Sequence, residues 1–413
     1  MKGQAMHVAI IGAGIVGVST AIWLQRAGVR VTLIDREGPA AGTSQGNAGV
    51  LAAASIVPIP VPGLLAKAPR MLLDPRQPLF LRWPHLPRLV PFLAPYLASA
   101  REHERIGDAL SLMLHDTYEQ HAALAAGTGA ERYLHAGDYV FGYTKAGLAA
   151  DEKAWGARER RGHPFEVIEE PGRYDPLLAH GFERLVRCPG HGRISDPGAY
   201  VRALADHFER EGGRFLRAEV RHVDRGRVVL PEAEVAADEI VVTSGVWSKR
   251  LLERHGVTVR METERGYHIE FVNPSHMPRS PVMVAWGKFV LTPMDGRLRA
   301  AGIVEFGGLD DRRSKAPFAL LRKQTLEVLP DLTCERVVEW MGHRPSTSDS
   351  LPLVGRFADG LWAGFGHQHV GLTAGPKTGR WLARMLTGEH DNTDLAPFAP
   401  TRFGARHQTG DQP

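Results

Sequence analysis

The sequence predicts an α/β protein in which a Rossmann-type nucleotide-binding domain is interleaved with an antiparallel-sheet domain. Three observations support this fold class. A glycine-rich turn joins a buried strand to a helix near the N-terminus, strands separated by turns fill residues 257–340, and a strand, a glycine-rich loop and a helix follow near the C-terminus. Strands that alternate with helices indicate a parallel sheet, whereas strands separated by short turns indicate an antiparallel one.

Composition and charge narrow the class of protein. The chain has 413 residues, 43% hydrophobic and 23% charged, which excludes wholesale disorder and fibrous repeats. Its 50 Lys and Arg against 46 Asp and Glu give a net charge of +4. There is no block of about five or six like charges, so no nucleic-acid partner is expected. No apolar run approaches the roughly 18 residues of a membrane span. A strand starting at His7 leaves no room for a signal peptide, so we expect a cytoplasmic protein, with peripheral contact at the inner membrane left open.

Cysteine and histidine spacing does not indicate a metal site. Cys188 and Cys334 lie 146 positions apart, and the chain has no CxxC pair. We therefore expect two buried, reduced thiols rather than a disulfide. His367 and His369 have no Cys or carboxylate partner nearby, so no metal is expected.

The first thirty-five residues carry the nucleotide-binding pattern. His7–Ile11 is an apolar strand, 18–27 reads as a helix that ends at Gly28, and 29–35 is a second strand. Between the first strand and the helix, Gly12 makes a tight turn, Gly14 lets backbone approach a pyrophosphate, and Gly17 lets helix and strand pack closely. The amides and dipole at the helix start attract the anion.

Asp35 strengthens this interpretation. It follows Gly17 by 18 residues and would accept hydrogen bonds from a ribose, while repelling the extra phosphate of NADP. The pattern therefore predicts a dinucleotide site. The segment Thr43-Ser44-Gln-Gly-Asn47-Ala-Gly49 comes next. It suits a loop against pyrophosphate and flavin, although an ordinary polar turn is an equal alternative.

The middle of the chain is less informative. Residues 57–97 are rich in proline, which breaks long helices, and form either a packed excursion over the active site or a lid or membrane-surface element. The first of these alternatives is favoured. The remaining pattern predicts a helix over 101–126, a strand over 136–143, a helix over 198–210 capped by Asp196, and a strand over 234–242. That last strand leads into Ser244-Gly245, where backbone passes close to a nucleotide or simply turns.

The antiparallel region and the C-terminal region complete the pattern. Strands are expected over 266–272, 281–286, 287–293 and 297–305, followed by a helix over 318–329. Gly342-His-Arg344-Pro and then Gly366-His367-Gln-His-Val-Gly371-Leu372-Thr373 follow, the latter opening a helix that runs to Leu386. A helix start aimed at a flavin stabilises negative charge on the reduced ring.

Three motifs give the chain a resemblance to a known family over residues 7 to about 390. They are Gly12 to Gly17 with Asp35, the Thr43–Gly49 segment, and Gly342-x-Arg344-Pro with Gly366-His367-x-x-x-Gly371-x-Thr373. The sequence resembles the FAD-dependent D-amino acid oxidase-like oxidoreductases, and within them the small subunit of the bacterial D-amino acid dehydrogenases.

The resemblance implies FAD as the cofactor and a set of site residues. Its cofactor-binding residues would be Gly12, Gly14, Gly17, Asp35, Arg36, Ser44, Asn47, Gly49, Ser244, Gly245, Gly366, His367, Gly371, Leu372 and Thr373. Arg344 matches the arginine that clamps the substrate carboxylate, a role that its fork geometry suits. Tyr267 and His268 stand where such enzymes place active-site polar groups, although both fit equally well as plain strand residues.

The same resemblance implies a reaction. Arg344 would hold an amino acid so that its α-hydrogen leaves as hydride to flavin N5 from about 3–3.5 Å. The imino acid then hydrolyses to a 2-oxo acid and ammonia, and D-amino acids, including cyclic ones such as D-proline or hydroxy-D-proline, are the expected substrates. Electrons would pass to a quinone or another carrier. The alternatives are a glycine or sarcosine oxidase that uses O₂, and a flavoprotein subunit of a larger complex. The oligomeric state stays open.

We predict a discontinuous domain organisation. The Rossmann-type FAD-binding domain takes residues 1–56, 187–248 and 341–400. The antiparallel-sheet substrate domain, with its Pro-rich cap, takes 57–186 and 249–340. A polar tail covers 401–413.

Overall fold

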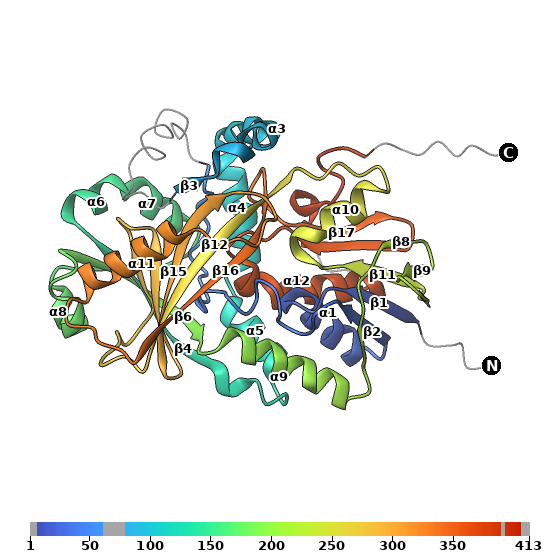
Figure 1. Ribbon diagram of the computed structural model, residues 1–413, viewed down its shortest axis with the longest axis horizontal. Coiled ribbons are helices and arrows are strands. Elements are labelled where there is room, and N and C mark those ends of the chain that lie inside the picture. The colour runs from blue at the N-terminus through green and yellow to red at the C-terminus, as the bar shows by residue number, and fades with distance from the viewer. Residues whose placement is uncertain (1–5, 61–78, 390–392, 406–413) are drawn as a thin grey trace.

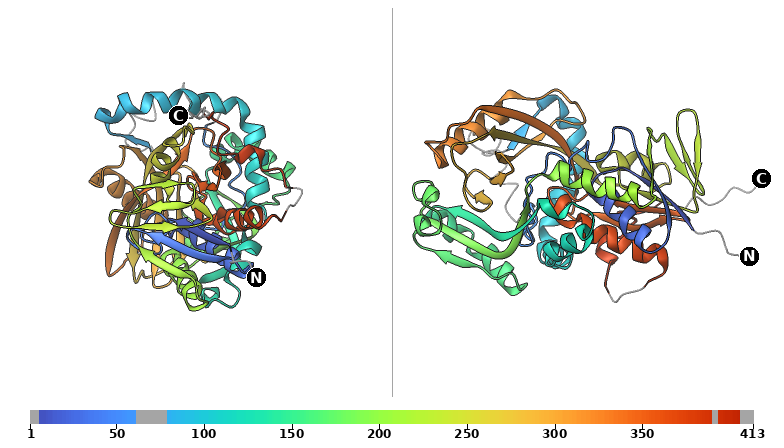
Figure 2. Two further views of the ribbon diagram at one scale, coloured as in Figure 1. Left: turned by 90° about the vertical axis from the view of Figure 1, so that its right-hand side faces the viewer. Right: turned by 90° about the horizontal axis from the view of Figure 1, so that it is seen from below.

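The protein is an α/β molecule built on two large sheets, as the sequence predicts (Figure 1). The computed structural model describes residues 6–60, 79–389 and 393–405. Parts of the predicted Pro-rich cap (61–78) and of the predicted tail (406–413) lie outside these described residues. Figure 2 shows the larger sheet and its helices at one end of the elongated molecule and the nucleotide-binding pattern at the other.

The smaller sheet contains the strands that the nucleotide-binding pattern predicts. Its order is β17-β18-β11-β1-β2-β7, parallel throughout except for the β17–β18 pair. The strands are β1 (His7–Ile11), β2 (Arg30–Asp35), β7 (Arg214–Arg217), β11 (Glu239–Val242), β17 (Leu353–Ala358) and β18 (Leu361–Phe365).

Strand β1 is apolar along its whole length because both of its faces are covered. Val8 and Ile10 pack in the core shared with the helices, whereas Ala9 and Ile11 pack toward a small three-stranded sheet. That sheet consists of β8 (His222–Asp224), β9 (Arg227–Val229) and β10 (Glu234–Ala236).

The predicted single strand over 234–242 is wrong. It is divided into β10 and β11, which belong to different sheets. The division falls at Ala237 and Asp238, where the Asp238 carboxylate accepts a hydrogen bond from the amide of His7 at 2.7 Å. This side-chain contact holds the chain at the point where it passes from one sheet to the other.

Five helices form the layer on the other face of the smaller sheet. They are α1 (Ile15–Arg26), α4 (His103–Leu114), α5 (Thr117–Ala125), α9 (Pro197–Arg210) and α12 (Gly371–Thr387). Of these, α1, α9 and α12 contact the strands, and α4 and α5 pack against α12. Helices α1 and α12 pack closely, since a Cβ at Gly379 would lie 2.6 Å from the amide nitrogen of Thr20. The predicted start of α9 is confirmed, because the Asp196 carboxylate accepts from the amide of Ala199 at 2.8 Å.

The single helix predicted over 101–126 is also wrong. It consists of a short 3-10 turn, η2 (Ser99–Glu102), followed by α4 and α5, with a break at residues 115–116. Beyond the break, the Thr117 hydroxyl donates to the carbonyl of Thr373 at 2.6 Å. The change of direction therefore lets α5 meet the start of α12.

The larger sheet has nine strands and is mainly antiparallel, as predicted. Its order is β16-β12-β15-β14-β13-β4-β6-β5, with β3 added beside β15, and the β13–β4 and β15–β3 pairs are parallel. The strands are β3 (Leu79–Leu81), β4 (Leu134–Tyr143), β5 (Glu166–Ile168), β6 (Arg184–Ile194), β12 (Met261–Val272), β13 (Val282–Val284), β14 (Phe289–Met294), β15 (Arg297–Phe306) and β16 (Arg336–Thr347). Helix α11 (Lys315–Val328) packs on one face through a buried apolar cluster that includes Phe318 and Leu321.

The strand pairing bears on the predicted domain ranges. Residues 187–194 and 341–347 pair within the larger sheet, whereas the predicted division assigns them to the FAD-binding domain. Part of the predicted polar tail also packs on the body, because the Arg402 guanidinium pairs with the Asp349 carboxylate at 2.7 Å. The division into domains stays a proposal.

The remaining elements are short. They are η1 (Trp83–His85), α3 (Leu86–Ala98), η3 (Glu131–Tyr133), α6 (Lys145–Ala150), α7 (Glu152–Arg160), α8 (Pro171–Tyr174), η4 (Pro176–Leu178), η5 (Gly245–Trp247), α10 (Ser248–Glu253) and η6 (Ala396–Phe398). No helix in the described parts of the chain is long and apolar enough to cross a membrane. Both cysteines are free, but only Cys188 is buried; Cys334 is half-buried, contrary to the expectation.

Helix α3 exists despite its prolines. Pro87, Pro91 and Pro95 recur every fourth residue, so they lie along one side of the helix. Pro87 and Pro91 are exposed and Pro95 is half-buried. The carbonyls that lose their helical partners are therefore on the outer side, where water can satisfy them, and the helix persists for 13 residues.

Candidate active site

A cavity of about 1110 Å³ lies where the two large sheets meet. On one side it is lined by residues at the carboxyl ends of β1, β2, β11 and β18, and on the other by β12, β15 and β16. Ligands of open α/β sheets bind at this edge of the parallel strands. The volume exceeds the roughly 300–1,000 Å³ typical of a pocket for one small ligand.

The glycine-rich turn between β1 and α1 requires its glycines for steric reasons. Gly12 has a φ of +104°, and a Cβ there would lie 2.7 Å from the Cα of Ser244. A Cβ at Gly17 would lie 1.9 Å from the carbonyl oxygen of Gly12, so this glycine allows the close helix–strand packing. Gly14 lines the cavity with its backbone. The Ser44 hydroxyl accepts from the amide of Ile15 at 3.0 Å and so ties the 43–49 loop to the helix start.

Asp35 lines the cavity and also supports this turn. One carboxylate oxygen accepts from the amide of Ala13 at 2.8 Å, and the other accepts from the amides of Glu37 and Gly38 at 2.9 Å each. The carboxylate therefore holds the ends of β1 and β2 together at the place where the sequence predicts a ribose.

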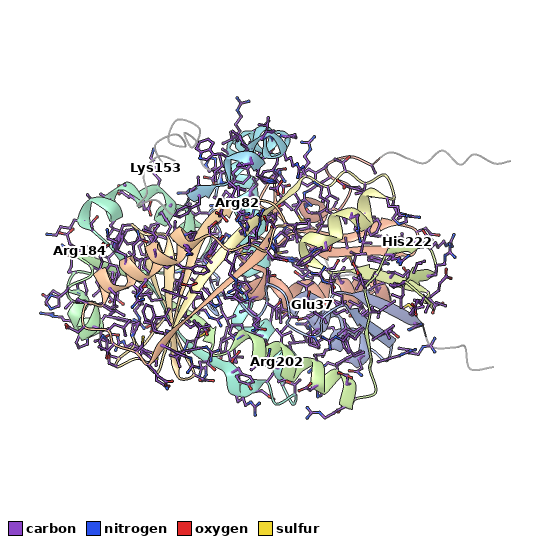
Figure 3. The ribbon with its side chains drawn as sticks, viewed as in Figure 1. Glu37, Arg82, Lys153, Arg184, Arg202 and His222 are labelled. Atoms are coloured by element: carbon purple, nitrogen blue, oxygen red, sulfur yellow. The ribbon has the colours of Figure 1, made fainter. Side chains whose placement is uncertain are left out.

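The nucleotide end of the cavity has a second wall. The Arg36 guanidinium lies over the Trp247 ring, 4.3 Å from its centroid, and both residues line the cavity. Ser244 and Gly245 line it as well, and Gly245 has a φ of +59°. Glu37, labelled in Figure 3, lies near the middle of the molecule at the end of β2.

The 43–49 loop enters the cavity and then leaves it. Asn47 lines the cavity, and its side-chain oxygen accepts from the amide of Gly49 at 2.9 Å. Gly49 is not among the cavity-lining residues; its φ is +77°, and a Cβ there would lie 2.6 Å from the carbonyl oxygen of Ile194. This glycine turns the chain toward β6.

His268 supports the same loop from outside the cavity. Its Nδ1 lies 3.0 Å from the carbonyl oxygen of Gly46, and its ring stacks on Trp340 at 4.9 Å between centroids. Burial lowers the pKa of His268 well below its usual value, so the ring is neutral and donates to the carbonyl. The structure therefore places His268 behind the loop and does not bring it to Arg344.

The Gly/His loop after β18 forms the far wall. Gly366, with a φ of +89°, passes close to Thr347, since a Cβ there would lie 2.8 Å from its methyl carbon. His367 lines the cavity, and its Nε2 lies 3.0 Å from the hydroxyl of Thr378 on α12. Burial lowers the pKa of His367 to about 3, so it is neutral.

The start of α12 also faces the cavity and is held by α5. Gly371, Leu372 and Thr373 all line the cavity. The carbonyl of Leu372 lies 2.9 Å from Nε2 of His121, whose Nδ1 lies 2.9 Å from the hydroxyl of Tyr200. Two buried side chains far away in sequence thus position the helix start.

Arg344 lies across the strands of the larger sheet. It comes from β16, and a Cβ at Gly266 of the neighbouring β12 would lie 2.5 Å from its Nε. Its Nη2 donates to the carbonyl of Gly302 on β15 at 3.2 Å. The missing side chain at Gly266 therefore makes room for the guanidinium, which lines the cavity.

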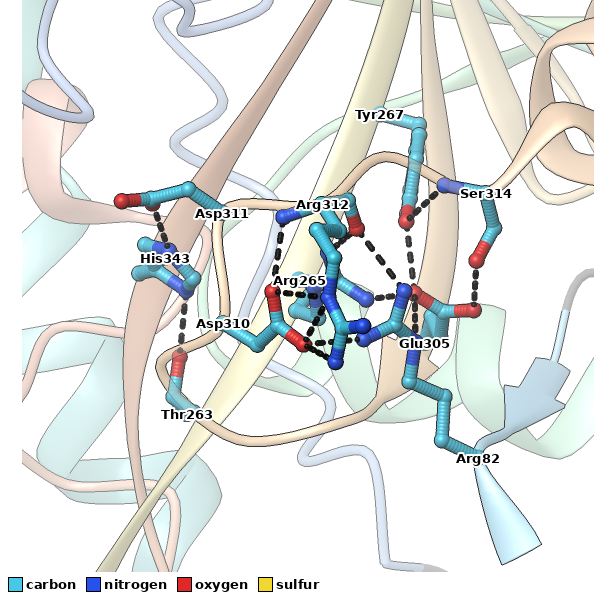
Figure 4. Close-up of polar contacts among 10 residues, drawn as sticks. All are labelled: Arg82, Thr263, Arg265, Tyr267, Glu305, Asp310, Asp311, Arg312, Ser314 and His343. Carbon is cyan, nitrogen blue, oxygen red and sulfur yellow. Dashed lines mark hydrogen bonds and ion pairs between the residues drawn. The ribbon is translucent and has the colours of Figure 1, made fainter. Parts of the chain in front are cut away.

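Tyr267 belongs to a different polar cluster (Figure 4). Its hydroxyl donates to Glu305 at 2.6 Å and accepts from the amide of Ser314 at 3.4 Å. Glu305 also pairs with the fully buried Arg265 at 2.5 Å. Side chains alternate along a strand, so Tyr267 and Arg265 point to the α11 side, away from Gly266 and Arg344. Tyr267 is among the cavity-lining residues, but its hydroxyl is taken up by this cluster.

This cluster also anchors the segment that covers the cavity. Arg82, labelled in Figures 3 and 4, follows β3, and its guanidinium pairs with Asp310 at 2.8 Å. Tyr96 and several leucines of β3 and α3 line the cavity beyond it. Residues 79–97 therefore pack over the cavity, as the favoured prediction expects, and their outer face leaves the membrane-surface alternative open.

Several cavity-lining residues were not predicted from the sequence. Glu264, Tyr96, Trp247 and Trp340 all line the cavity, as does His369, which was considered only as a metal ligand. The sequence does contain a signal for Glu264, because residues 264 and 266 of one strand lie on the same face of the sheet. Tyr96 carries no comparable signal.

A parallel sheet with a glycine turn, joined to a large sheet that carries a half-buried arginine facing the cavity, is typical of dinucleotide-dependent oxidoreductases. The comparisons identify the family. Residues 7–385 match the model of the FAD dependent oxidoreductase family DAO. The chain belongs to this family, which confirms the resemblance and the predicted FAD cofactor.

Individual proteins resemble the chain over nearly its whole length. It is 37% identical to the D-amino-acid oxidase of Bradyrhizobium diazoefficiens, over 97% of this chain and 99% of that protein. It is 30% identical to the D-amino acid dehydrogenase of Rhizobium rhizogenes, over 97% and 100%. Glycine oxidase from Geobacillus kaustophilus has a similar fold, with a TM-score of 0.75, 23% identity and coverage of 96% and 99%.

The residues present fit FAD. The crowded glycine turn allows backbone amides to approach a diphosphate, because only hydrogen occupies the space where a Cβ would clash. The cavity is continuous from Asp35 through Ser44 to Gly371, as a long dinucleotide requires. Residues 364–373, a mixture of glycines, apolar residues and neutral polar residues, line the cavity together with Arg344.

Proposed function

We propose that this protein catalyses the FAD-dependent oxidative deamination of D-amino acids, with Arg344 as the carboxylate anchor. One observation carries the proposal. The half-buried guanidinium of Arg344 faces the cavity and has no carboxylate within ion-pair distance among the described residues, and it donates a hydrogen bond to the Gly302 carbonyl instead.

The charge of Arg344 explains what the cavity binds. Burial lowers the pKa of Arg344, and the charge of Glu264, which lies beyond ion-pair distance, offsets this effect only in part. An anionic ligand in direct contact with the guanidinium would compensate its charge more fully. A planar carboxylate pairs with the guanidinium through two parallel hydrogen bonds. The site is therefore suited to a substrate that carries a carboxylate.

The chain's own residues would hold the cofactor and exclude water from the substrate. Bound FAD supplies the oxidising chemistry, because it accepts the electron pair of the substrate's Cα–H bond. The turn at Gly12 to Gly17, Asp35 and Ser44 would hold its nucleotide half, and the 366–373 segment its ring. Tyr96 and the leucines of α3 exclude water from the reacting carbon.

The names of the relatives support D-amino acids as the substrates. The relatives that are 37% and 30% identical over nearly the whole chain are called D-amino-acid oxidase and D-amino acid dehydrogenase. Cyclic D-amino acids such as D-proline belong to the same proposal, because Arg344 recognises only the carboxylate that all of them share.

We further propose that the electrons pass to a quinone or another carrier, with contact at a membrane surface. Helix α3 and the turn before it support this. Trp83 is 60% exposed and Val90 is 54% exposed, and no Asp or Glu occurs between residues 79 and 101. Arg88 is exposed beside them. An apolar face bordered by arginine suits an anionic lipid surface.

The test of the reaction is an anaerobic titration of the purified yellow protein. The panel contains D- and L-alanine, both enantiomers of proline, glycine and sarcosine. We expect D-amino acids to bleach the flavin absorbance and their L-enantiomers to leave it unchanged. Bleaching by glycine or sarcosine alone would replace the proposal with the amine-oxidase alternative, and no bleaching by any member would reject amino acid oxidation.

A second measurement identifies the acceptor. The reduced protein is mixed with a water-soluble ubiquinone analogue under nitrogen, and separately with air-saturated buffer. We expect faster reoxidation by the quinone analogue. Faster reoxidation by oxygen would make the protein an oxidase, the name that the 37% identical relative carries.

A further inference from the structure

A second charged group of the larger sheet faces the same cavity as Arg344. Glu264 lies on β12 directly opposite Arg344 of β16 in the strand register. Side chains of directly opposed residues point to the same face of a sheet. Glu264 is 2% exposed and lines the cavity.

The two opposite charges do not pair with each other. Opposed residues on neighbouring strands have Cβ atoms about 5 Å apart, which is close enough for an ion pair. Instead the Arg344 side chain crosses over Gly266 and donates to the carbonyl of Gly302. Within the described parts of the chain, neither Glu264 nor Arg344 lies within 4.0 Å of a charged partner.

By strand geometry, the two groups are separated by about the length of an amino acid backbone. Strands rise about 3.3 Å per residue, so positions 264 and 266 on one face are about 7 Å apart. The guanidinium lies over position 266. A ligand with a carboxylate at one end and an ammonium group next to it spans this separation when each group makes one hydrogen bond of about 2.9 Å.

The surroundings of Glu264 favour an ionisable role. Burial raises the pKa of Glu264. The charge of Arg344 and the hydroxyl of Ser346 act in the opposite direction and offset this effect only in part. Tyr96 of α3 lies near enough for the Glu264 charge to raise the pKa of its phenol. His369 lies near Arg344 and is neutral, because burial lowers its pKa to about 4. Arg344 is thus the cation that acts on Glu264 in the absence of a ligand.

We propose that Glu264 binds the α-ammonium group of the substrate while Arg344 binds its carboxylate, and that the Glu264 carboxylate accepts the ammonium proton before oxidation. This inference rests on the proposed function and adds a second catalytic residue to it. It also explains why the two charged groups stay apart without ligand, since the substrate would complete two charge pairs at once.

The chemical step balances with Glu264 as the base and with the oxidant that the proposed function already names. The Glu264 carboxylate takes one proton from the ammonium group, which leaves a neutral amine and a neutral carboxylic acid. The nitrogen lone pair that this frees is then available for the C=N bond, and bound FAD would supply the oxidation by accepting the hydrogen of the Cα–H bond with both electrons. A protonated ammonium has no lone pair, so this proton transfer has to come first.

The first test is the pH dependence of kcat/KM for D-alanine in Glu264→Gln. General bases typically contribute about 10²–10⁴-fold, so we expect a loss of at least 100-fold at pH 7. We also expect kcat/KM of the variant to rise about tenfold per pH unit until the substrate's own ammonium group is deprotonated. The unchanged protein is expected to level off at a lower pH.

The second test is binding without turnover, measured by calorimetry on the FAD-loaded protein. 2-Aminoisobutyrate has the carboxylate and the ammonium group but no α-hydrogen, and isobutyrate lacks the ammonium group. In Glu264→Gln we expect the Kd of 2-aminoisobutyrate to rise at least tenfold and that of isobutyrate to change less than twofold. Equal effects on both ligands would mean a structural role and would overturn the proposal.

Two further variants complete the design. Glu339→Gln is the matched control, because Glu339 is exposed on the paired strand β16 and does not line the cavity; we expect its kinetics to be unchanged. Glu264→Asp keeps a carboxylate and should retain the levelling of the pH profile at a reduced rate. If Glu264→Gln kept the pH profile of the unmutated protein, this inference alone would be rejected. If no D-amino acid bleached the flavin absorbance of the unmutated protein, the proposed function itself would be rejected.

Discussion

At the scale of single residues, glycines that lack a side chain shape the cavity as much as the side chains that line it. Gly266 has no side chain, and the guanidinium of Arg344 uses that space. Gly12 and Gly17 remove the Cβ atoms that would obstruct the phosphate-binding turn. The functional groups are therefore placed by backbone contacts that allow little adjustment.

The proposed role of Arg344 predicts a specific kinetic defect when this residue is replaced. Arg344→Met removes a charge-assisted, two-pronged pair with the substrate, which is worth about 3 kcal/mol. We expect KM for D-alanine to rise about 100-fold or more with the FAD content unchanged, as measured by steady-state kinetics and the flavin spectrum.

Arg336 offers a matched control for this replacement. It lies on the same strand, is exposed and pairs only with the neighbouring Glu335. Arg336→Met should leave KM unchanged, and Arg344→Lys should fall between the two because it keeps the charge but loses the fork. A normal KM in Arg344→Met would remove Arg344 from the carboxylate site.

At the scale of elements, the start of α12 depends on α5. His121 bridges the Leu372 carbonyl and the Tyr200 hydroxyl from a fully buried position, and the break before α5 makes this contact geometrically accessible. The sequence predicted the Gly/His loop and the helix start, but the side chain that holds them comes from a segment about 250 residues earlier.

Replacing His121 by Leu should loosen this junction. The change leaves the buried Tyr200 hydroxyl and the Leu372 carbonyl without their partner, which costs about 2–4 kcal/mol of unfolding free energy. We expect this loss at pH 7.5 in urea unfolding of the FAD-loaded protein, together with weaker FAD retention on gel filtration.

The same residue predicts a pH effect with a definite sign. Burial lowers the pKa of His121 from 6.5 to about 4, so the unfolded chain takes up a proton before the folded one does. The contribution of His121 is fully present above pH 6.5 and is lost progressively as the pH falls toward 4, by about 2 kcal/mol at pH 5.

This pH effect can be checked in the same variant. The loss of unfolding free energy between pH 7.5 and pH 5 should be about 2 kcal/mol smaller in His121→Leu than in the unchanged protein. His103→Leu, at an exposed position of α4, should behave like the unchanged protein. Identical pH dependence in all three would mean that His121 is not held neutral.

At the scale of the whole molecule, function depends on the junction of two sheets. The parallel sheet supplies the turn that we propose for the dinucleotide, and the nine-stranded sheet supplies Arg344 and Glu264, the residues proposed to bind the substrate. Helix α3 lies at the top of the molecule over this junction (Figure 1). Trp83 of η1 and Val90 of α3 are exposed to solvent. The outward face is the part of the molecule on which the proposed membrane contact depends.

Vesicle binding tests that surface. Each large apolar side chain that enters a lipid interface contributes about 1.5–3 kcal/mol at most. We therefore expect Trp83→Ser with Val90→Ser to reduce co-sedimentation with vesicles of phosphatidylglycerol and phosphatidylcholine at least tenfold. Val167→Ser with Val338→Ser removes two exposed apolar residues at other places on the larger sheet and should have no effect. Absence of binding by the unchanged protein would reject membrane contact.

The sequence by itself determined the local parts of this protein. The glycine turn, Asp35 after the second strand and the Gly/His loop are recognisable because each depends on the backbone geometry of a few consecutive residues. The same holds for the start of α9 at Asp196, where one side chain caps the helix that follows it.

Only the tertiary structure decided which polar side chains meet. Glu264 and Arg344 are 80 residues apart and face one another only because β12 and β16 pair in that register. A shift of one residue would exchange Glu264 for Arg265, which instead points with Tyr267 to the opposite face. Register and strand alternation depend on the packing of the whole sheet, and for that reason Tyr267 and Arg344, both expected in one site, lie on its two sides.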